Sequence, residues 1–115
     1  VGRYNCAAER VRGRVVVDAA CGTGYGAKRL MEQGARSVSG FDLSSEAVEA
    51  ARQQNTWPEV TFEVGDVTKL PVASASIDVY LSFETIEHLP DDQAYLAEAR
   101  RVLKADGCLI CSTPN

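Results

Sequence analysis

Residues 15–27 read VVVDAACGTGYGA, and this stretch decides the fold. Three consecutive valines are typical of a strand that is buried on both faces. The carboxylate of Asp18 ends the apolar run, and a glycine-rich turn follows at residues 22–26. Glycines let the backbone approach a ligand closely, and the N-terminus of the next helix presents unpaired N–H groups. The stretch therefore predicts a strand, a ligand-binding turn and a helix.

The rest of the chain alternates between segments typical of strands and segments typical of helices. We expect strands at residues 14–18, 37–41, 60–64, 77–83 and 108–112. We expect helices at residues 4–12, 27–33, from Ser44 or Ser45 to 54, and from Asp91 or Asp92 to 103. This alternation predicts a doubly wound, mainly parallel α/β sheet of about five strands in the order 3-2-1-4-5. A ligand then lies beyond the carboxyl ends of the strands, beside the first one.

Composition limits the classes of protein. A chain of 115 residues with 45% hydrophobic residues builds one core, so we expect a single domain over residues 1–115. There is no apolar run of membrane-spanning length and no secretory pattern at the start, which predicts no membrane partner and a cytoplasmic location. The net charge of −4 disfavours nucleic acid as a partner. Cys108 and Cys111 form a C-x-x-C pattern in a strand, which we interpret as structural and reduced.

The turn itself leaves two ligand classes open. Gly22, Gly24 and Ala27 fit the dinucleotide pattern G-x-G-x-x-A, and Asp42 follows where a ribose-binding acid is expected. Asp18 tips the balance, since its charge repels a pyrophosphate but suits a ligand that carries an ammonium and a sulfonium.

Two further strand ends add donors and acceptors to the same edge. Gly65 and Asp66 follow the third strand, where a carboxylate accepts from an exocyclic adenine amine. Ser82 and Phe83 end the fourth strand, where the reacting end of the ligand is expected.

Five segments, in order, resemble the class I S-adenosylmethionine-dependent methyltransferases: VVVDAACGTGYG, GFDLS, VGDVTKLP, IDVYLSFETIEHL and EARRVLKADGCLICSTPN. The chain resembles the methyltransferase type 11 domain. The resemblance implies a Rossmann-like fold, S-adenosylmethionine as cofactor, and methyl transfer to an acceptor. The cofactor-binding residues that it implies are Asp18, Ala20, Gly22, Gly24, Tyr25, Asp42, Leu43, Gly65, Asp66, Val67, Ser82 and Phe83.

Several of these residues also have plain structural interpretations. Asp18 could simply end a strand, Asp42 could cap the second helix, and Asp66 could be an ordinary turn residue. Tyr25 could shield the ligand or pack on its own helix, and Phe83 could be part of the core.

Glu84, Glu87 and His88 form the pattern E-x-x-E-H. On a helix these three residues share a face, and two carboxylates with an imidazole suit a divalent cation. The pattern resembles the metal-binding residues of small-RNA 2′-O-methyltransferases and ubiquinone-pathway O-methyltransferases. The alternatives are a general base at His88 and a structural turn beside the cofactor.

Members of the family usually carry two further strands, which are missing after the fifth strand here. We therefore expect an exposed strand edge that favours a homodimer. The leading hypothesis is a methyltransferase with an unidentified acceptor, preferably oxygen on a small molecule. A non-catalytic S-adenosylmethionine-binding module that needs a partner is the alternative, and an NAD-dependent oxidoreductase is a third.

Overall fold

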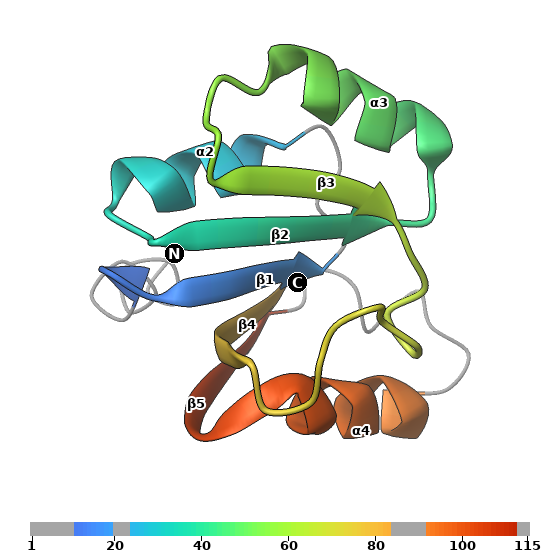
Figure 1. The fold of residues 1–115 in the computed structure, drawn as a ribbon. Coiled ribbons are helices and arrows are strands. Elements are labelled where there is room, and N and C mark those ends of the chain that lie inside the picture. The colour runs from blue at the N-terminus through green and yellow to red at the C-terminus, as the bar shows by residue number, and fades with distance from the viewer. Residues whose placement is uncertain (1–10, 20–23, 84–91, 113–115) are drawn as a thin grey trace.

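A computed structural model describes residues 11–19, 24–83 and 92–112. Its sheet has five strands in the order β3-β2-β1-β4-β5, and every neighbouring pair is parallel (Figure 1). The strands are β1 (Val15–Ala19), β2 (Ser37–Asp42), β3 (Val60–Val64), β4 (Ile77–Phe83) and β5 (Leu103–Ser112). The predicted fold class and strand order are confirmed.

Helices cover both faces of the sheet. In the described ranges the helices are α2 (Tyr25–Glu32), α3 (Ser45–Gln54) and α4 (Asp92–Val102). Most of the helix expected at residues 4–12 lies outside these ranges. Figure 1 shows α2 and α3 on one side of the sheet and α4 on the other. Val16 belongs to the core cluster that includes Leu30 of α2, while Val17 belongs to the cluster that includes Ala99 of α4. Successive residues of a strand point to opposite faces, so the valine run of β1 faces a core on each side.

Local signals set the helix ends. Ser44 is the N-cap of α3, and its hydroxyl accepts from the Ala47 N–H at 3.1 Å. This confirms the prediction that Ser44 or Ser45 caps the helix. Gly34 follows α2 in the left-handed region with φ +98°, which confirms it as the helix stop. The helix α2 begins at Tyr25, two residues earlier than predicted, because Gly24 rather than the whole glycine turn is its N-cap.

The start of β5 differs from the prediction of residue 108. The strand begins at Leu103, directly after α4, and pairs with Ile77 before a register shift brings Cys108 opposite Val79. Gly107 lies in this irregular stretch, where an added Cβ would approach the carbonyl oxygens of Lys104 and Asp78 at 3.0 and 3.1 Å. The Asp–Gly pair therefore forms a bulge within the strand rather than the turn before it. No helix in the described ranges is both long and apolar enough to cross a membrane.

Asp78 joins the first and fourth strands at the end of the sheet opposite the strand carboxyl ends. Its Oδ2 accepts from the Val15 N–H at 2.9 Å, and its Oδ1 lies 3.2 Å from Lys104 Nζ. These contacts lower the pKa of Asp78 below the ordinary value, the hydrogen bond from Val15 most strongly. The carboxylate therefore satisfies the first N–H of the central strand.

We expect Asp78→Ala to lower the free energy of unfolding by about 2 kcal/mol, because a charged acceptor is lost and the Val15 N–H stays half-buried. Urea unfolding at pH 7 measures this. The matched control is Asp106→Ala, since Asp106 is an exposed acid in the same region of the chain. Equal stabilities of the two variants would contradict the assigned role.

Candidate functional site

The carboxyl ends of β1, β2 and β3 bring the predicted acids to one edge of the sheet. Asp18 pairs in register with Gly40, and Gly40 with Phe62, so the three strands end side by side. Beyond the last β2–β3 pair, the Gly65 N–H donates to the Asp42 carbonyl at 3.0 Å. The residues that follow β3 are thereby held against the end of β2.

Some predicted residues can be placed only in part. Ala20 and Gly22, and the cluster of Glu84, Glu87 and His88, lie outside the described residues. Ser82 and Phe83 end β4, and Ser82 pairs with Ala19 of β1. Among the described residues there is no group of three or more His, Cys, Asp or Glu side chains that could hold a metal ion.

Asp18 is the one charged side chain that is buried in the described part of the chain, with 7% of its surface exposed. The strand alternation places it on the same face as Val16, below α2 and α3. Burial raises the pKa of Asp18 to about 7, and the charge of Asp42 contributes to this shift. Two carboxylates therefore repel each other at this edge. A ligand that brings a positive charge relieves the repulsion, whereas a pyrophosphate increases it.

Asp42 does not cap α3, because the cap is Ser44. Its Oδ1 accepts from the Ser44 N–H at 2.9 Å, so the carboxylate is oriented by the first residues after β2. Asp42 is half-buried and sits where β2 ends, next to the residues that follow β3. An oriented carboxylate at this position is able to accept from a pair of hydroxyls.

Asp66 builds a turn, as its structural interpretation proposed. Its Oδ1 accepts from the Thr68 N–H at 2.8 Å and from the Thr68 hydroxyl at 2.6 Å, and these bonds lower the pKa of Asp66. Oδ2 makes no hydrogen bond to any residue in the described part of the structure. The turn therefore fixes one carboxylate oxygen and leaves the other exposed, so the turn role is compatible with ligand binding.

Apolar side chains surround these acids. The large hydrophobic residues that are exposed in the described ranges are Tyr25 at 67%, Leu43 at 69% and Val64 at 51%. Tyr25 begins α2, Leu43 follows β2 and Val64 ends β3, so all three lie at the same edge. Exposed apolar residues that gather around polar acceptors are typical of a ligand site. Val64 was not predicted, although its position directly before Gly65 and Asp66 was a usable signal.

Tyr25 is exposed, and its side-chain hydrogen bond and its ring contact are with its own helix. Its ring does not enter the core, and its hydroxyl accepts from Arg29 Nη1 at 3.3 Å, with the guanidinium 5.9 Å from the ring centre. Tyr25 therefore lies on the outer surface of α2, held by a residue one turn further along. In this position it is able to cover a ligand.

Gly24 has a packing role that the sequence did not reveal. Its φ is +91°, and an added Cβ would lie 2.9 Å from Phe62 Cζ and 3.2 Å from Ala51 Cβ. The start of α2 thus lies tightly against α3 and β3. The glycine is required by this contact as well as by any ligand.

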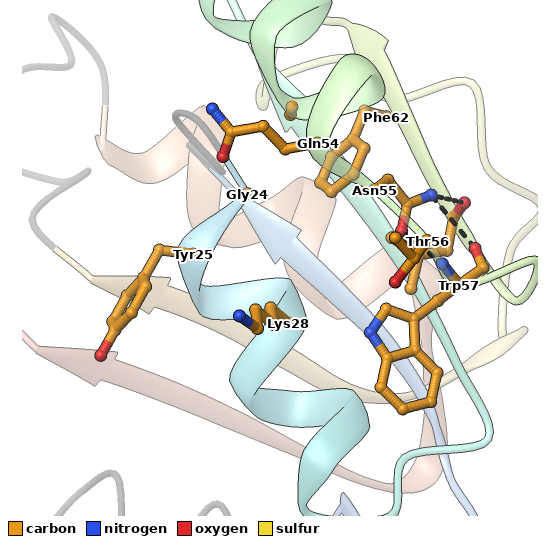
Figure 2. A pocket seen from close by; sticks show the side chains of 10 residues that line it. Gly24, Tyr25, Lys28, Gln54, Asn55, Thr56, Trp57 and Phe62 are labelled. Carbon is orange, nitrogen blue, oxygen red and sulfur yellow. Dashed lines mark hydrogen bonds between the residues drawn. The ribbon is translucent and has the colours of Figure 1, made fainter.

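A cavity of about 310 Å³ adjoins the site between α2 and α3 (Figure 2). Gly24, Tyr25 and Lys28 line one side, and Trp57 and Phe62 are among the residues that line the other. None of the three acids lines it. The cavity is therefore a neighbour of the acidic edge and not the edge itself.

We expect Gly24→Ala to lower the free energy of unfolding by about 3 kcal/mol, because left-handed strain adds to the clash with Phe62. Gly13→Ala is the matched control, since Gly13 has φ +71° but nothing lies within 4 Å of an added Cβ. The free energy of unfolding of the control should fall by only about 1 kcal/mol. Thermal or urea unfolding measures both, and equal losses would remove the packing role.

We expect Asp18→Asn to stabilise the ligand-free protein above pH 7. The folded pKa of Asp18 lies above that of the unfolded chain. The free energy of unfolding of the wild type therefore falls as pH rises between about 4 and 7, by up to about 4 kcal/mol. Asparagine stays neutral, so this loss disappears in the variant.

Urea unfolding of both proteins at pH 5 and pH 8 measures the effect. Asp66, Asp78 and Glu98 have lowered pKa values, so their contribution is lost only as pH falls below the ordinary carboxyl range. A wild type and a variant that lose the same stability between the two pH values would place the titrating group elsewhere.

Comparison with known proteins identifies the family of this chain. The family model of the methyltransferase domain matches residues 17–111. A "Probable S-adenosylmethionine-dependent methyltransferase" of Mycolicibacterium smegmatis is 40% identical over 112 residues, which are 97% of this chain and 42% of the relative. The malonyl-[acyl-carrier protein] O-methyltransferase of Hahella chejuensis is 37% identical over 85% of this chain and 36% of the relative.

The ubiquinone/menaquinone biosynthesis C-methyltransferase of Caulobacter vibrioides is 33% identical over 86% of this chain and 43% of the relative. The structure is also similar to a Haloferax volcanii complex between the Trm112 methyltransferase activator and a candidate methyltransferase. That match has a TM-score of 0.86 and 31% identity, and it covers 95% of this chain and 50% of that one.

The chain spans less than half the length of these curated relatives. The residues matched by the family model include Asp18 and Asp42 at the ends of β1 and β2, and Asp66 after β3. The chain therefore belongs to the methyltransferase domain family, the family of its S-adenosylmethionine-dependent relatives.

Proposed function

We propose that this domain binds S-adenosylmethionine at the carboxyl edge of its sheet and takes part in methyl transfer. The observation that carries the proposal is the buried carboxylate of Asp18 beside Asp42. Two neighbouring carboxylates disfavour a bound phosphate, because like charges repel. A bound ammonium compensates their negative charge. This charge arrangement also supports S-adenosylmethionine over NAD, the ligand of the third hypothesis.

The residues present fit each part of this cofactor. Asp18 would bind the ammonium of the amino-acid end, together with the backbone of Ala20, Gly22 and Gly24. Asp42 would accept from the ribose hydroxyls, and Leu43 and Tyr25 would cover the apolar faces. The exposed Oδ2 of Asp66 would accept from the adenine amine, with the backbone of Gly65 and Val67 beside it. Ser82 and Phe83 would lie near the reacting end.

When bound, S-adenosylmethionine supplies a methyl group that its sulfonium activates, so the difficult chemistry belongs to the cofactor. The protein holds the amino-acid end by charge and the adenosine by hydrogen bonds. This leaves the methyl group as the part that the acceptor approaches. Alignment and a fixed polar environment are then the protein's contribution to the rate. None of the three acids needs to exchange a proton with the acceptor.

The identity of the methyl acceptor is a further part of the proposal. We propose oxygen on a small molecule, which the likeness to an O-methyltransferase supports and the likeness to a C-methyltransferase does not. The net charge of −4 disfavours nucleic acid. A single domain and a cytoplasmic location also remain proposals. Metal binding by Glu84, Glu87 and His88, or a general base at His88, stays a prediction.

A partner-dependent module is the second candidate function. The Haloferax volcanii neighbour is a complex with a methyltransferase activator, and the present chain spans half of the matched protein. In the structure β5 forms one edge of the sheet. Pairing of that edge with a second copy would make a homodimer.

Calorimetric titration with S-adenosylhomocysteine, and with NAD in parallel, tests the cofactor proposal. We expect one-site binding of S-adenosylhomocysteine and none of NAD. Asp42→Ala should weaken binding by about 1–3 kcal/mol through the lost ribose hydrogen bonds. Asp106→Ala is the charge-matched control and should leave the affinity unchanged. Binding of NAD alone would contradict the proposed cofactor, and equal affinities of the two variants would contradict the role of Asp42.

Transfer of labelled methyl from S-adenosylmethionine separates the two candidate functions. A chain that binds the cofactor, but transfers methyl to small-molecule acceptors only after a partner is added, would favour the module.

A further inference from the structure

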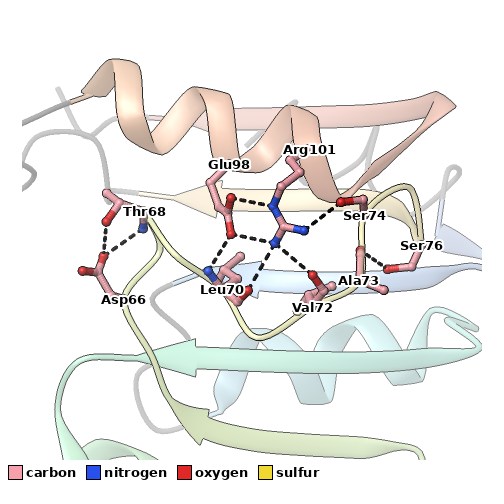
Figure 3. Close-up of polar contacts among 9 residues, drawn as sticks. All are labelled: Asp66, Thr68, Leu70, Val72, Ala73, Ser74, Ser76, Glu98 and Arg101. Carbon is pink, nitrogen blue, oxygen red and sulfur yellow. Dashed lines mark hydrogen bonds and ion pairs between the residues drawn. The ribbon is translucent and has the colours of Figure 1, made fainter.

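An ion pair on α4 lies outside the site described so far and contacts the loop that carries Asp66. Glu98 and Arg101 are one turn apart on the helix and share a face. Arg101 Nε lies 2.7 Å from Glu98 Oε1, and Arg101 Nη2 lies 2.7 Å from Glu98 Oε2. This two-point geometry fixes both side chains. Figure 3 shows the pair facing the loop between β3 and β4.

Both members of the pair bind the backbone of this loop. Glu98 Oε2 accepts from the Leu70 N–H at 2.6 Å. Arg101 Nη2 donates to the carbonyls of Leu70 at 3.2 Å and Val72 at 2.9 Å, and Nη1 donates to the Ser74 hydroxyl at 2.9 Å. The Ala75 N–H also donates to the Arg101 carbonyl at 2.9 Å. Five hydrogen bonds thus tie residues 70–75 to α4.

The fixed point lies directly next to the turn of Asp66. The Lys69 N–H donates to the Asp66 carbonyl at 2.9 Å, so the turn closes one residue before Leu70. At its other end, the Gly65 N–H is held by the Asp42 carbonyl. The turn is therefore clamped on both sides. The Glu98–Arg101 pair holds the Leu70 end by hydrogen bonds, and the buried side chains of Val67 and Leu70 pack in the same core cluster as Ala99 of α4.

Helix α4 is held on the sheet by apolar packing as well. Leu96, Ala99 and Val102 of this helix pack in the core cluster that contains Val17 and Tyr80. Arg101 keeps 36% of its side chain exposed, and Glu98 keeps 11%. The polar contacts of the pair are with the loop, so loosening them should affect the loop before the helix.

We propose that Glu98 and Arg101 are positioning residues that set the preference of the site for a 6-aminopurine, by holding the turn of Asp66 in place. The inference rests on the proposed binding of the adenosine moiety. Lysine keeps the charge of Arg101 but has no planar fork for two loop carbonyls and a carboxylate. A loosened turn leaves Asp66 Oδ2 less well aimed at an exocyclic amine.

The test compares S-adenosylhomocysteine with S-inosylhomocysteine, in which an oxygen replaces the purine amine. The wild type should prefer S-adenosylhomocysteine by about 100-fold. Its purine amine donates to the Asp66 carboxylate, whereas the oxygen of S-inosylhomocysteine is an acceptor that faces the same carboxylate. In Arg101→Lys and Glu98→Gln this preference should fall by about tenfold. Asp78→Ala is the control for lost stability, since its contact lies at the other end of the sheet, and its preference should stay within about twofold of the wild type.

A double-variant cycle then asks whether Arg101 acts through Asp66. Asp66→Asn alone should reduce the preference, and adding Arg101→Lys should reduce it no further. If Arg101 has only a structural role, Arg101→Lys should weaken the binding of both ligands equally. If Arg101 and Asp66 act independently, the effects of the two substitutions on the preference should add. Either result overturns the inference. A wild type that binds neither ligand would instead refute the proposed function, on which the inference rests.

Discussion

Burial of β1 on both faces is the constraint on which the rest of the structure depends. Val16 and Val17 have no exposed surface, and they belong to different core clusters. A strand with two apolar faces has to lie in the middle of a sheet with a layer of helices on each side. The crossovers through α2 and α3 pass over one face and the crossover through α4 passes over the other, so the strand order runs outward from β1 in both directions as β3-β2-β1-β4-β5. The position of the ligand edge follows from this order.

The same strand carries the residue that conflicts with this constraint. Asp18 follows two fully buried valines and is itself buried, so its charge is unfavourable in the ligand-free protein. A sequence selected for stability alone would have an apolar or amide residue there. The position is explained if a positively charged ligand group compensates the carboxylate. Strained or unfavourable groups that persist in a central strand are typical of functional sites.

Much of the fold could be predicted because it depends on local pattern. The valine run, the Ser44 cap and the Gly34 stop each act within a few residues of their own position. The start of β5 could not be predicted, since Leu103 follows a helical pattern and becomes a strand only by pairing with Ile77. The packing role of Gly24 depends on Phe62, which is 38 positions further along the sequence. Val64 was expected only as a strand residue, and its 51% exposure at the end of β3 could not be predicted from that pattern.

The acids at the ligand edge are held in place by different forces, which explains why only part of the site was predictable. Asp18 is fixed by apolar packing, which the pattern of its own strand reveals. Asp66 is exposed on its turn, which is held by the buried side chains of Val67 and Leu70 and by the hydrogen bonds of Glu98 and Arg101. Glu98 lies 28 positions from the Leu70 N–H that it accepts from, and no periodic pattern links the two. If Asp66 binds the adenine as proposed, contacts from α4 on the far face of the sheet help to hold the adenine end of the site, and substitutions on that helix should change ligand preference without touching the ligand.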